Sequence, residues 1–448
     1  MTRQAMTTDL YQLSMAAAYV AVGVPRRASF ELFIRKMPKR RGYLIAAGLE
    51  QALEYLSALR FDADDIDFLR SLPMFQGAPA GFFEELARLR FTGNVSAAPE
   101  GTLIFANEPL LRVEAPIMEA QLAETYLLST ILFQTMIASK AARVAGAASG
   151  RPVVDFGTRR AHGPQAGVLA ARAAHIGGCV GTSNVEAGRR FGVPVFGTMA
   201  HSFVSASRTE KEAFEQFMRV FPDNASLLVD TYNIREGVQN ALSMGHGVKS
   251  VRIDSGDLQH ESRSVREQLN AARRPDIKII ASGDLNECRI HKLIQNEAPI
   301  DIFGVGTELT TSRDEPSLSG VYKLISYERD GGRTVPAAKT SAGKRTYPYP
   351  KQVYRQSGSD GMFMRDVIAL VDEKHKGEPL LEKVMENGER IHPPPPLELA
   401  RNRAAEQLER LPCRYKCLQN APEYPAYFSK KLEKARRKAE SARLNGSD

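Results

Sequence analysis

The chain contains two closely similar stretches, KSVRIDSGDL at residues 249–258 and IKIIASGDL at residues 277–285. Each is a short apolar run followed by a Ser-Gly-Asp turn, and the second turn follows the first by 27 residues. Continuous apolar runs of this kind are typical of strands buried in a parallel sheet. The spacing fits one strand–helix unit. We therefore expect two adjacent parallel strands that carry the same polar chemistry at their ends.

Similar runs extend this pattern on both sides. Polar turns and stretches with helical spacing separate them, which indicates repeated βα units. Seven such units favour a barrel over an open parallel sheet, which stays the alternative. The seven candidate strands lie at residues 152–156, 178–181, 193–198, 226–230, 249–253, 277–281 and 302–305.

The regions on either side of these units have a different character. Before residue 115, strand-like runs accompany a helical pattern at residues 44–59, which indicates an α/β module with an antiparallel sheet. Residues 116–148 are predicted to form one long helix that leads into the barrel. The sheet-like runs outside the barrel lie at residues 28–34, 91–97, 110–113, 320–327 and 367–371.

This organisation predicts three segments. Residues 1–115 form an N-terminal domain and residues 116–319 form the α/β barrel. Residues 320–448 are expected to return to the first domain and to end in a basic helical tail. The proline-rich stretch at 392–396 is predicted to be a rigid extended connector inside the last segment.

Composition limits the classes of function. The chain has 448 residues, 43% of them hydrophobic and 25% charged, as in ordinary globular proteins. A net charge of +8 favours anionic partners such as phosphates, but it is too small to indicate nucleic acid. The basic residues at 430–443 are interpreted as a solvated helix face. No apolar run approaches the roughly 20 residues of a membrane span, so no membrane contact is expected.

The four cysteines are too few to form a disulfide framework in a chain of this size, so we expect a reducing cytoplasm. Cys413 and Cys417 stand four residues apart. A zinc site there would need two further ligands, and none is evident nearby. We therefore expect no metal site built from protein ligands alone.

Nearly every candidate strand is followed by a polar or glycine-rich turn, where barrels of this kind place their sites. Glycines let backbone N–H groups approach phosphate oxygens, and arginines offer a planar fork to phosphate or carboxylate. Aspartates can hold ribose hydroxyls, or Mg²⁺ through water. Several such turns on one edge predict a site for an anionic sugar phosphate. The turns lie at residues 155–160, 181–184, 197–202, 254–257, 282–284 and 304–307.

His201 follows the third run. A single histidine is more often structural than catalytic, but this one lies at the predicted active edge. A neutral imidazole at that edge could serve as a base, a ligand or a phosphate acceptor. The sequence has no Walker A, GxGxxG, HExxH or GxSxG motif, which argues against the usual nucleotide-binding and hydrolase folds.

Taken together, these turns resemble the nicotinate phosphoribosyltransferase family. The resemblance runs in the family's order from about residue 7 to about 355, and little beyond residue 390 can be matched. Its segments are TDLYQ at 8–12, DFGTRR at 155–160, GTSN at 181–184, GTMAHSF at 197–203, RIDSGDL at 252–258, GVGT at 304–307 and KTSAGK at 339–344.

The resemblance implies a type II phosphoribosyltransferase fold, an irregular α/β barrel beside an N-terminal α/β-sandwich domain. It implies a homodimer in which the partner subunit completes each active site. The implied reaction joins nicotinate to 5-phosphoribosyl 1-pyrophosphate, giving nicotinate mononucleotide and pyrophosphate in NAD biosynthesis. ATP hydrolysis is coupled to it through a phosphohistidine, and His201 matches that histidine. Mg²⁺ would accompany the pyrophosphate and ATP.

The resemblance also assigns roles to residues. His201, Arg252, Asp254 and Asp257 are the implied catalytic residues, with the two aspartates on ribose or on Mg²⁺-pyrophosphate and Arg252 on the nicotinate carboxylate or nearby phosphate. Tyr11 and Thr198 would contact nicotinate, Tyr11 acting across the dimer. The other candidate substrate-binding residues are Arg159, Ser202, Ser255, Gly256, Ser282, Gly283, Asp284, Gly304, Gly306 and Thr307, of which the glycines at 283, 304 and 306 and Thr307 would bind the 5′-phosphate.

One segment departs from the family. Residues 347–350 read Tyr-Pro-Tyr-Pro where the family pattern has Pro-Gly. Because a tyrosine resists a positive φ, we expect this loop to take a different turn.

Other functions stay open at this stage. Nicotinamide phosphoribosyltransferase shares the fold and takes a neutral amide, although residues 230–233 favour the nicotinate enzyme. Quinolinate phosphoribosyltransferase is shorter and lacks the histidine segment. A barrel acting on another sugar phosphate, or a non-catalytic protein that binds anions or nucleic acid through the basic tail, are further alternatives.

Overall fold

The computed structural model describes residues 4–24, 27–223, 225–337 and 346–444. The chain divides into two compact units, Met1–Thr135 with Ser317–Asp448, and Met136–Pro316. The boundaries predicted from the sequence are 115/116 and 319/320. The first one differs because α5 (Ile117–Leu122) and the first half of α6 (Glu124–Ala147) pack into the core of the first unit. The single helix predicted over 116–148 is interrupted at Ala123.

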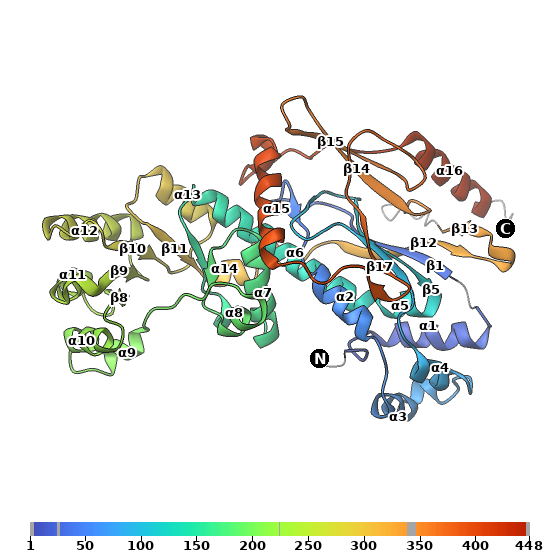
Figure 1. Ribbon diagram of the computed structural model, residues 1–448, viewed down its shortest axis with the longest axis horizontal. Coiled ribbons are helices and arrows are strands. Elements are labelled where there is room, and N and C mark those ends of the chain that lie inside the picture. The colour runs from blue at the N-terminus through green and yellow to red at the C-terminus, as the bar shows by residue number, and fades with distance from the viewer. Residues whose placement is uncertain (1–3, 25–26, 224, 338–345, 445–448) are drawn as a thin grey trace. The chain divides into compact units, whose positions relative to one another are not determined.

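The first unit is built on a seven-stranded antiparallel sheet, in the order β13-β12-β1-β5-β3-β17-β18. Helix α5 lies against β1 and β5, and Phe30, Leu32, Leu111 and Val113 of these two strands belong to one buried core (Figure 1). This is the expected α/β sandwich. The strands are β1 Arg27–Ile34, β3 Asn94–Ala97, β5 Pro109–Pro116, β12 Gly320–Glu328, β13 Thr334–Pro336, β17 Glu382–Glu386 and β18 Glu389–Arg390.

The remaining elements of this unit are short. The predicted helix at 44–59 is divided into a strand, β2 (Leu44–Ile45), and a helix, α2 (Leu49–Ala58). Strand β2 pairs with β4 (Leu103–Ile104). Gly48, at φ +95°, separates the two elements and is the N-cap of α2. The other helices before residue 100 are α1 Leu10–Ala21, α3 Ala63–Ser71 and α4 Phe82–Arg88.

The C-terminal part adds a four-stranded sheet, ordered β16 (Glu378–Pro379), β14 (Lys351–Ser357), β15 (Phe363–Leu370) and β19 (Ala426–Phe428). Two helices accompany it, α15 (Leu397–Arg410) and α16 (Lys430–Leu444). Leu432 of α16 is buried beside Val353 and Ile368, while Lys434 and Lys438 are exposed. The basic tail is therefore a packed amphipathic helix whose charges face solvent, as predicted.

Tyr349 contradicts one expectation. Its φ is +69°, so the tyrosine adopts the left-handed conformation that the sequence analysis expected it to avoid. Its N–H donates to Ile325 O (3.0 Å) and its carbonyl accepts from Lys351 Nζ (3.0 Å). These contacts, and the packing of its ring on the C-terminal core, hold the backbone against its intrinsic preference. The predicted family segment at 339–344 lies outside the described residues.

The second unit contains a parallel sheet in the order β7-β6-β11-β10-β9-β8. The first strand along the chain, β6, pairs with the last, β11, as in a barrel. The third predicted strand, 193–198, forms only a bridge from Val195 to Thr182, and within the described residues no ladder joins it to β8. The sheet is thus a curled, incomplete barrel. Its strands are β6 Val153–Asp155, β7 Gly181–Thr182, β8 Ala225–Leu228, β9 Val248–Ile253, β10 Lys278–Ala281 and β11 Ile302–Val305.

Helices alternate with these strands, and α11 and α12 flank β8 to β10 (Figure 1). In α12, Leu258, Ser262, Val265 and Leu269 form the buried face at helical spacing. Because the strands are parallel, their carboxyl ends meet at one edge. The helices are α7 Pro164–Ile176, α8 Val185–Phe191, α9 His201–Ser205, α10 Glu210–Val220, α11 Ile234–Ser243, α12 Leu258–Ala271, α13 Glu287–Gln295 and α14 Thr307–Thr310.

Among the described residues, no helix has the length and apolar character that a membrane crossing requires.

Candidate active site

Arg252 on β9 connects three strand ends. Its Nε donates to Ser282 Oγ (2.8 Å), its Nη1 to Thr198 Oγ1 (3.1 Å) and its Nη2 to Asp254 Oδ1 (2.8 Å). The guanidinium also lies over the Phe156 ring, 5.4 Å from its centroid. These contacts use three of the five N–H donors of the arginine and leave two for a ligand. We call Arg252, Thr198, His201, Asp230, Asp254 and Ser282 the strand-end site.

Asp254 is the carboxylate at the centre of this site. Ser282 Oγ donates a short hydrogen bond to Asp254 Oδ1. Partial burial favours the neutral acid, but the Ser282 hydrogen bond and the charge of Arg252 outweigh it and hold the pKa of Asp254 below its ordinary value. The group is therefore an anion at neutral pH, suited to hydroxyl groups or to a cation.

Asp230 was not among the predicted site residues. Its Oδ2 accepts from the backbone N–H of Asp254 (2.8 Å) and from Ser255 Oγ (2.7 Å). Its Oδ1 is buried without a hydrogen-bond partner in the described part of the chain. One signal was present in the sequence, because Asp230 ends an apolar run just as Asp155 and Asp254 do.

His201 begins α9 at the edge of the site. Its Nδ1 lies 3.2 Å from Thr231 Oγ1, and its Nε2 lies 3.9 Å from Asp254 Oδ2. The side chain is 45% exposed. One ring nitrogen is thus oriented by a hydroxyl, and the other faces a carboxylate and solvent.

The glycines in these turns differ in how closely neighbouring atoms approach them. Gly283 has φ +95°, and a Cβ there would lie 2.1 Å from the carbonyl oxygen of Asp254. A Cβ on Gly304 would lie 2.5 Å from the Phe156 ring, whereas Gly306 has more room. Gly256 also has a positive φ, +79°, but its nearest neighbour would be a side-chain carbon at 3.4 Å.

Asp155 stabilises the first turn from inside. Its Oδ1 accepts from Gly157 N–H (2.8 Å) and its Oδ2 from Thr182 Oγ1 (2.7 Å). Burial raises the pKa of this carboxyl, which those two hydrogen bonds partly offset. The turn it supports presents Arg159, which is exposed and makes no hydrogen bond or ion pair with any described residue.

The structure does not bring every candidate together. Asp257 accepts from the N–H groups of Gln259 (3.0 Å) and His260 (3.4 Å), so it caps α12. Asp284 and Ser202 are exposed near the same edge, and Thr307 is half-buried at the start of α14. Tyr11 lies on α1 of the first unit, 49% exposed, and partial burial followed by the charges of Glu124 and Asp9 raises the pKa of its hydroxyl.

Comparison with known proteins places this geometry in a family. Three family models match the chain: the nicotinate phosphoribosyltransferase N-terminal domain at residues 6–132, the quinolinate phosphoribosyl transferase C-terminal domain at 137–314, and the nicotinate phosphoribosyltransferase C-terminal domain at 374–436. Nicotinate phosphoribosyltransferase pncB2 of Mycobacterium tuberculosis is 45% identical over 452 residues, covering 99% of this chain and 94% of that protein.

The chain belongs to the nicotinate phosphoribosyltransferase family.

Further relatives and solved structures are similar to the chain. The Bacillus subtilis nicotinate phosphoribosyltransferase is 43% identical, covering 82% of this chain and 76% of that one. The crystal structure of human nicotinic acid phosphoribosyltransferase superposes with a TM-score of 0.85 at 29% identity, covering 96% of this chain and 99% of that chain. A nicotinate-nucleotide pyrophosphorylase structure from Pyrococcus furiosus gives 0.74 at 25% identity, covering 91% and 96%.

The family likeness reaches further than the short motifs indicated. The short motifs predicted little resemblance beyond residue 390, but the C-terminal family model extends to residue 436. This part of the chain folds into helix and sheet and carries no short polar motif like those of the barrel turns.

Proposed function

We propose that this member of the nicotinate phosphoribosyltransferase family transfers the phosphoribosyl group of 5-phosphoribosyl 1-pyrophosphate to nicotinate, yielding nicotinate mononucleotide and pyrophosphate. The observation that carries the proposal is the strand-end site, where Arg252, Asp254 and Ser282 meet on the barrel edge. The names of relatives that align along nearly the whole chain supply the pyridine substrate.

The anionic groups of the two substrates match the cations of the site. Arg252 has two N–H groups left for the nicotinate carboxylate or a phosphate oxygen. Arg159 is exposed and available to the same ligands. We assign Thr198 and Tyr11 to nicotinate. Tyr11 would reach it from the partner subunit of a homodimer, with each active site completed across the dimer.

The phosphoribosyl group would occupy the two glycine turns. Gly283, Gly304, Gly306 and Thr307 offer backbone N–H groups to the 5′-phosphate, because the glycines leave room for close approach. Ser202, Ser255, Gly256, Ser282 and Asp284 line the same edge and are the remaining proposed contacts.

Asp254 and Asp257 are proposed to serve the ribose or Mg²⁺-pyrophosphate. No cluster of three or more His, Cys, Asp or Glu side chains able to hold a metal occurs among the described residues. The carboxylates of Asp254 and Asp257 fit Mg²⁺, which is usually bound by one or two carboxylates together with substrate phosphates. The unpartnered, buried Asp230 Oδ1 is a further oxygen beside Asp254. Bound Mg²⁺ would supply positive charge to the leaving pyrophosphate.

We further propose that ATP phosphorylates His201 and that this step promotes transfer. The orientation of His201 supports the assignment, because Thr231 holds Nδ1 and leaves Nε2 to react, on a side chain that is 45% exposed. A phosphate there would add negative charge and strong acceptor oxygens beside Asp254, so its gain and loss would change substrate affinity.

A cytoplasmic setting is proposed from the cysteines. Cys288 and Cys413 are free thiols, and both are exposed. Exposed free thiols persist in a reducing compartment.

The direct test is an assay of mononucleotide formation. The protein is incubated with phosphoribosyl pyrophosphate and Mg²⁺, with and without ATP, and with nicotinate, nicotinamide or quinolinate as acceptor. We expect product from nicotinate and stimulation by ATP. Pyrophosphate release that is independent of the pyridine would reject the proposal.

His201→Ala tests the ATP step separately. We expect this variant to lose both ATP hydrolysis and ATP stimulation while retaining some basal transfer. If both ATP-dependent activities persist, the phosphohistidine assignment is wrong and the transferase assignment stands.

A further inference from the structure

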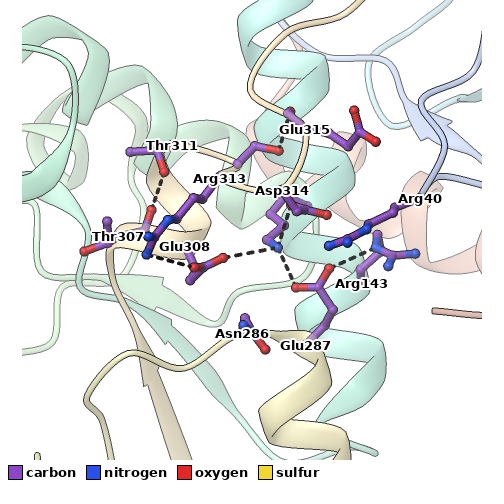
Figure 2. Close-up of polar contacts among 12 residues, drawn as sticks. Arg40, Arg143, Asn286, Glu287, Thr307, Glu308, Thr311, Arg313, Asp314 and Glu315 are labelled. Carbon is purple, nitrogen blue, oxygen red and sulfur yellow. Dashed lines mark hydrogen bonds and ion pairs between the residues drawn. The ribbon is translucent and has the colours of Figure 1, made fainter. Parts of the chain in front are cut away.

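A buried network of charges lies beside the two glycine turns in the second unit. Lys140 on α6 is 1% exposed, and its Nζ lies 2.5 Å from Glu287 Oε2, 2.8 Å from Asp314 Oδ1 and 3.9 Å from Glu308 Oε2. Arg143, one turn further along α6, donates from Nε to Glu287 Oε1 (3.2 Å). Figure 2 shows Glu287, Glu308 and Asp314 converging on this point.

The acidic partners of Lys140 come from the ends of the two turns. Glu287 is the first residue of α13 and lies three residues after Asp284, the last residue of the turn that contains Ser282 and Gly283. Glu308 and Asp314 follow the turn that contains Gly304 and Gly306. One ammonium group therefore joins both phosphate-binding turns to the same helix.

The network itself is unsuited to binding an anion. The charges of Lys140 and Arg143 are opposed by those of Glu287, Glu308 and Asp314, and Lys140 is out of reach of solvent. Buried ion pairs usually add little net stability over apolar packing, and in some proteins their directed contacts select one arrangement of the fold. Binding sites depend on such supporting contacts to stay within about 0.5 Å of the productive geometry.

We propose that Lys140 is a positioning residue that fixes the turns at 282–287 and 304–314 relative to each other, so that their N–H groups converge on the 5′-phosphate of phosphoribosyl pyrophosphate. This inference rests on the proposed function for the identity of the phosphate. Lys140 does not touch the substrate; it acts through Glu287, Glu308 and Asp314.

The experiment compares Lys140→Met with Lys351→Met. Lys351 is the matched control, because it is also buried and ion-paired, with Nζ 2.7 Å from Glu31 Oε2, but it belongs to the first unit, whereas the strand-end site is built from residues of the second. Ribose 5-phosphate is the probe, and its binding to the full chain is measured by calorimetry. The KM values for phosphoribosyl pyrophosphate and nicotinate are measured in parallel.

Both variants are expected to lower the melting temperature. Only Lys140→Met should weaken ribose 5-phosphate binding and raise the KM for phosphoribosyl pyrophosphate, by about tenfold or more, since misplacement of a binding group by about 1 Å costs on that order or above. The KM for nicotinate should change less than about twofold. Equal ribose 5-phosphate affinity in the wild type and in Lys140→Met would overturn the inference.

Asp314→Asn serves if Lys140→Met does not fold, because it weakens only one arm of the network and leaves the Lys140–Glu287 pair in place. We expect a smaller loss of ribose 5-phosphate affinity, about threefold or more, and an unchanged affinity overturns the inference. A wild type that neither binds ribose 5-phosphate nor forms the mononucleotide refutes the proposed function instead.

Discussion

The two Ser-Gly-Asp turns have the same sequence but do different work. The β9–β10 ladder places Ala281 opposite Ile253, so Ser282 lies opposite Asp254 and not opposite Ser255. Ser282 accordingly bonds to Arg252 and Asp254, whereas Ser255 bonds to Asp230. The second Ser-Gly-Asp turn is therefore displaced by one residue relative to the first in the strand pairing, and this register decides which side chains meet.

The aspartates of the two turns differ in the same way. Asp257 directly precedes α12 and caps it. Asp284 is followed by two more residues before α13, and Asn286 is the cap there. A side chain's role therefore depends on its distance from the strand end and from the helix start. Matched substitutions in the two turns test this difference.

The largest difference is expected between Gly283→Ala and Gly256→Ala. Both glycines have positive φ, so alanine costs about 1–2 kcal/mol of strain at either position. Only at Gly283 would the new Cβ meet backbone, 2.1 Å from Asp254 O, which forces the carboxylate of Asp254 to move. We expect Gly283→Ala to lower kcat/KM by about 100-fold and Gly256→Ala by much less. Urea unfolding measures the stability of the two variants, and steady-state assays measure their kcat/KM. An equal loss of kcat/KM in both variants would contradict the difference in backbone contact between Gly283 and Gly256.

Ser282→Ala and Ser255→Ala should differ in their pH dependence. Ser282 helps to hold the pKa of Asp254 down, so its removal raises that pKa and moves the acidic limb of the kcat/KM profile to higher pH. The lost hydrogen bonds to charged partners correspond to about 1.5–3 kcal/mol, or roughly tenfold or more in rate at neutral pH. Ser255→Ala should leave that limb in place.

The same variant changes stability in a defined direction. A depressed carboxyl pKa stabilises the fold above the unfolded value of about 3.9, and this contribution is lost as pH falls through the folded pKa. Ser282→Ala should therefore lose less stability than the wild type between neutral pH and the acidic side of that window. Thermal unfolding at neutral pH and at a pH below the folded pKa of Asp254 measures this loss of stability. An identical loss in the wild type and in Ser282→Ala would mean that Ser282 does not influence Asp254.

The smallest expected difference is the loss of stability caused by replacing Asp257 or Asp284. Asp257→Ala removes a helix cap and should cost about 1 kcal/mol, whereas Asp284→Ala should cost about 0.5 kcal/mol or less. Asp257→Ser restores the cap but not the carboxylate. If Asp257 also serves Mg²⁺-pyrophosphate, as proposed, stability returns with serine while activity stays low. Recovery of both would restrict Asp257 to capping.

Local patterns predicted much of this molecule. Six of the seven apolar runs in the barrel are strands, and Val195 marks the place of the seventh with a single bridge. That run contains Pro194, which has no N–H for a ladder, and Gly197. The glycines at 283 and 304 were also predicted, and neither position has room for a Cβ, because the carbonyl oxygen of Asp254 lies against Gly283 and the Phe156 ring lies against Gly304.

The amino-acid sequence by itself determined where strands end and which polar residues follow them, because apolar periodicity and turn chemistry act over a few residues. Only the tertiary structure decided that Asp230 supports Asp254, that Lys140 joins two turns, and that Tyr349 takes a positive φ. Each of these depends on partners 24 or more residues away, since Asp230 and Asp254 are separated by 24 and Tyr349 bonds to Ile325. Contacts at that separation follow from sheet register and packing, which no local pattern encodes.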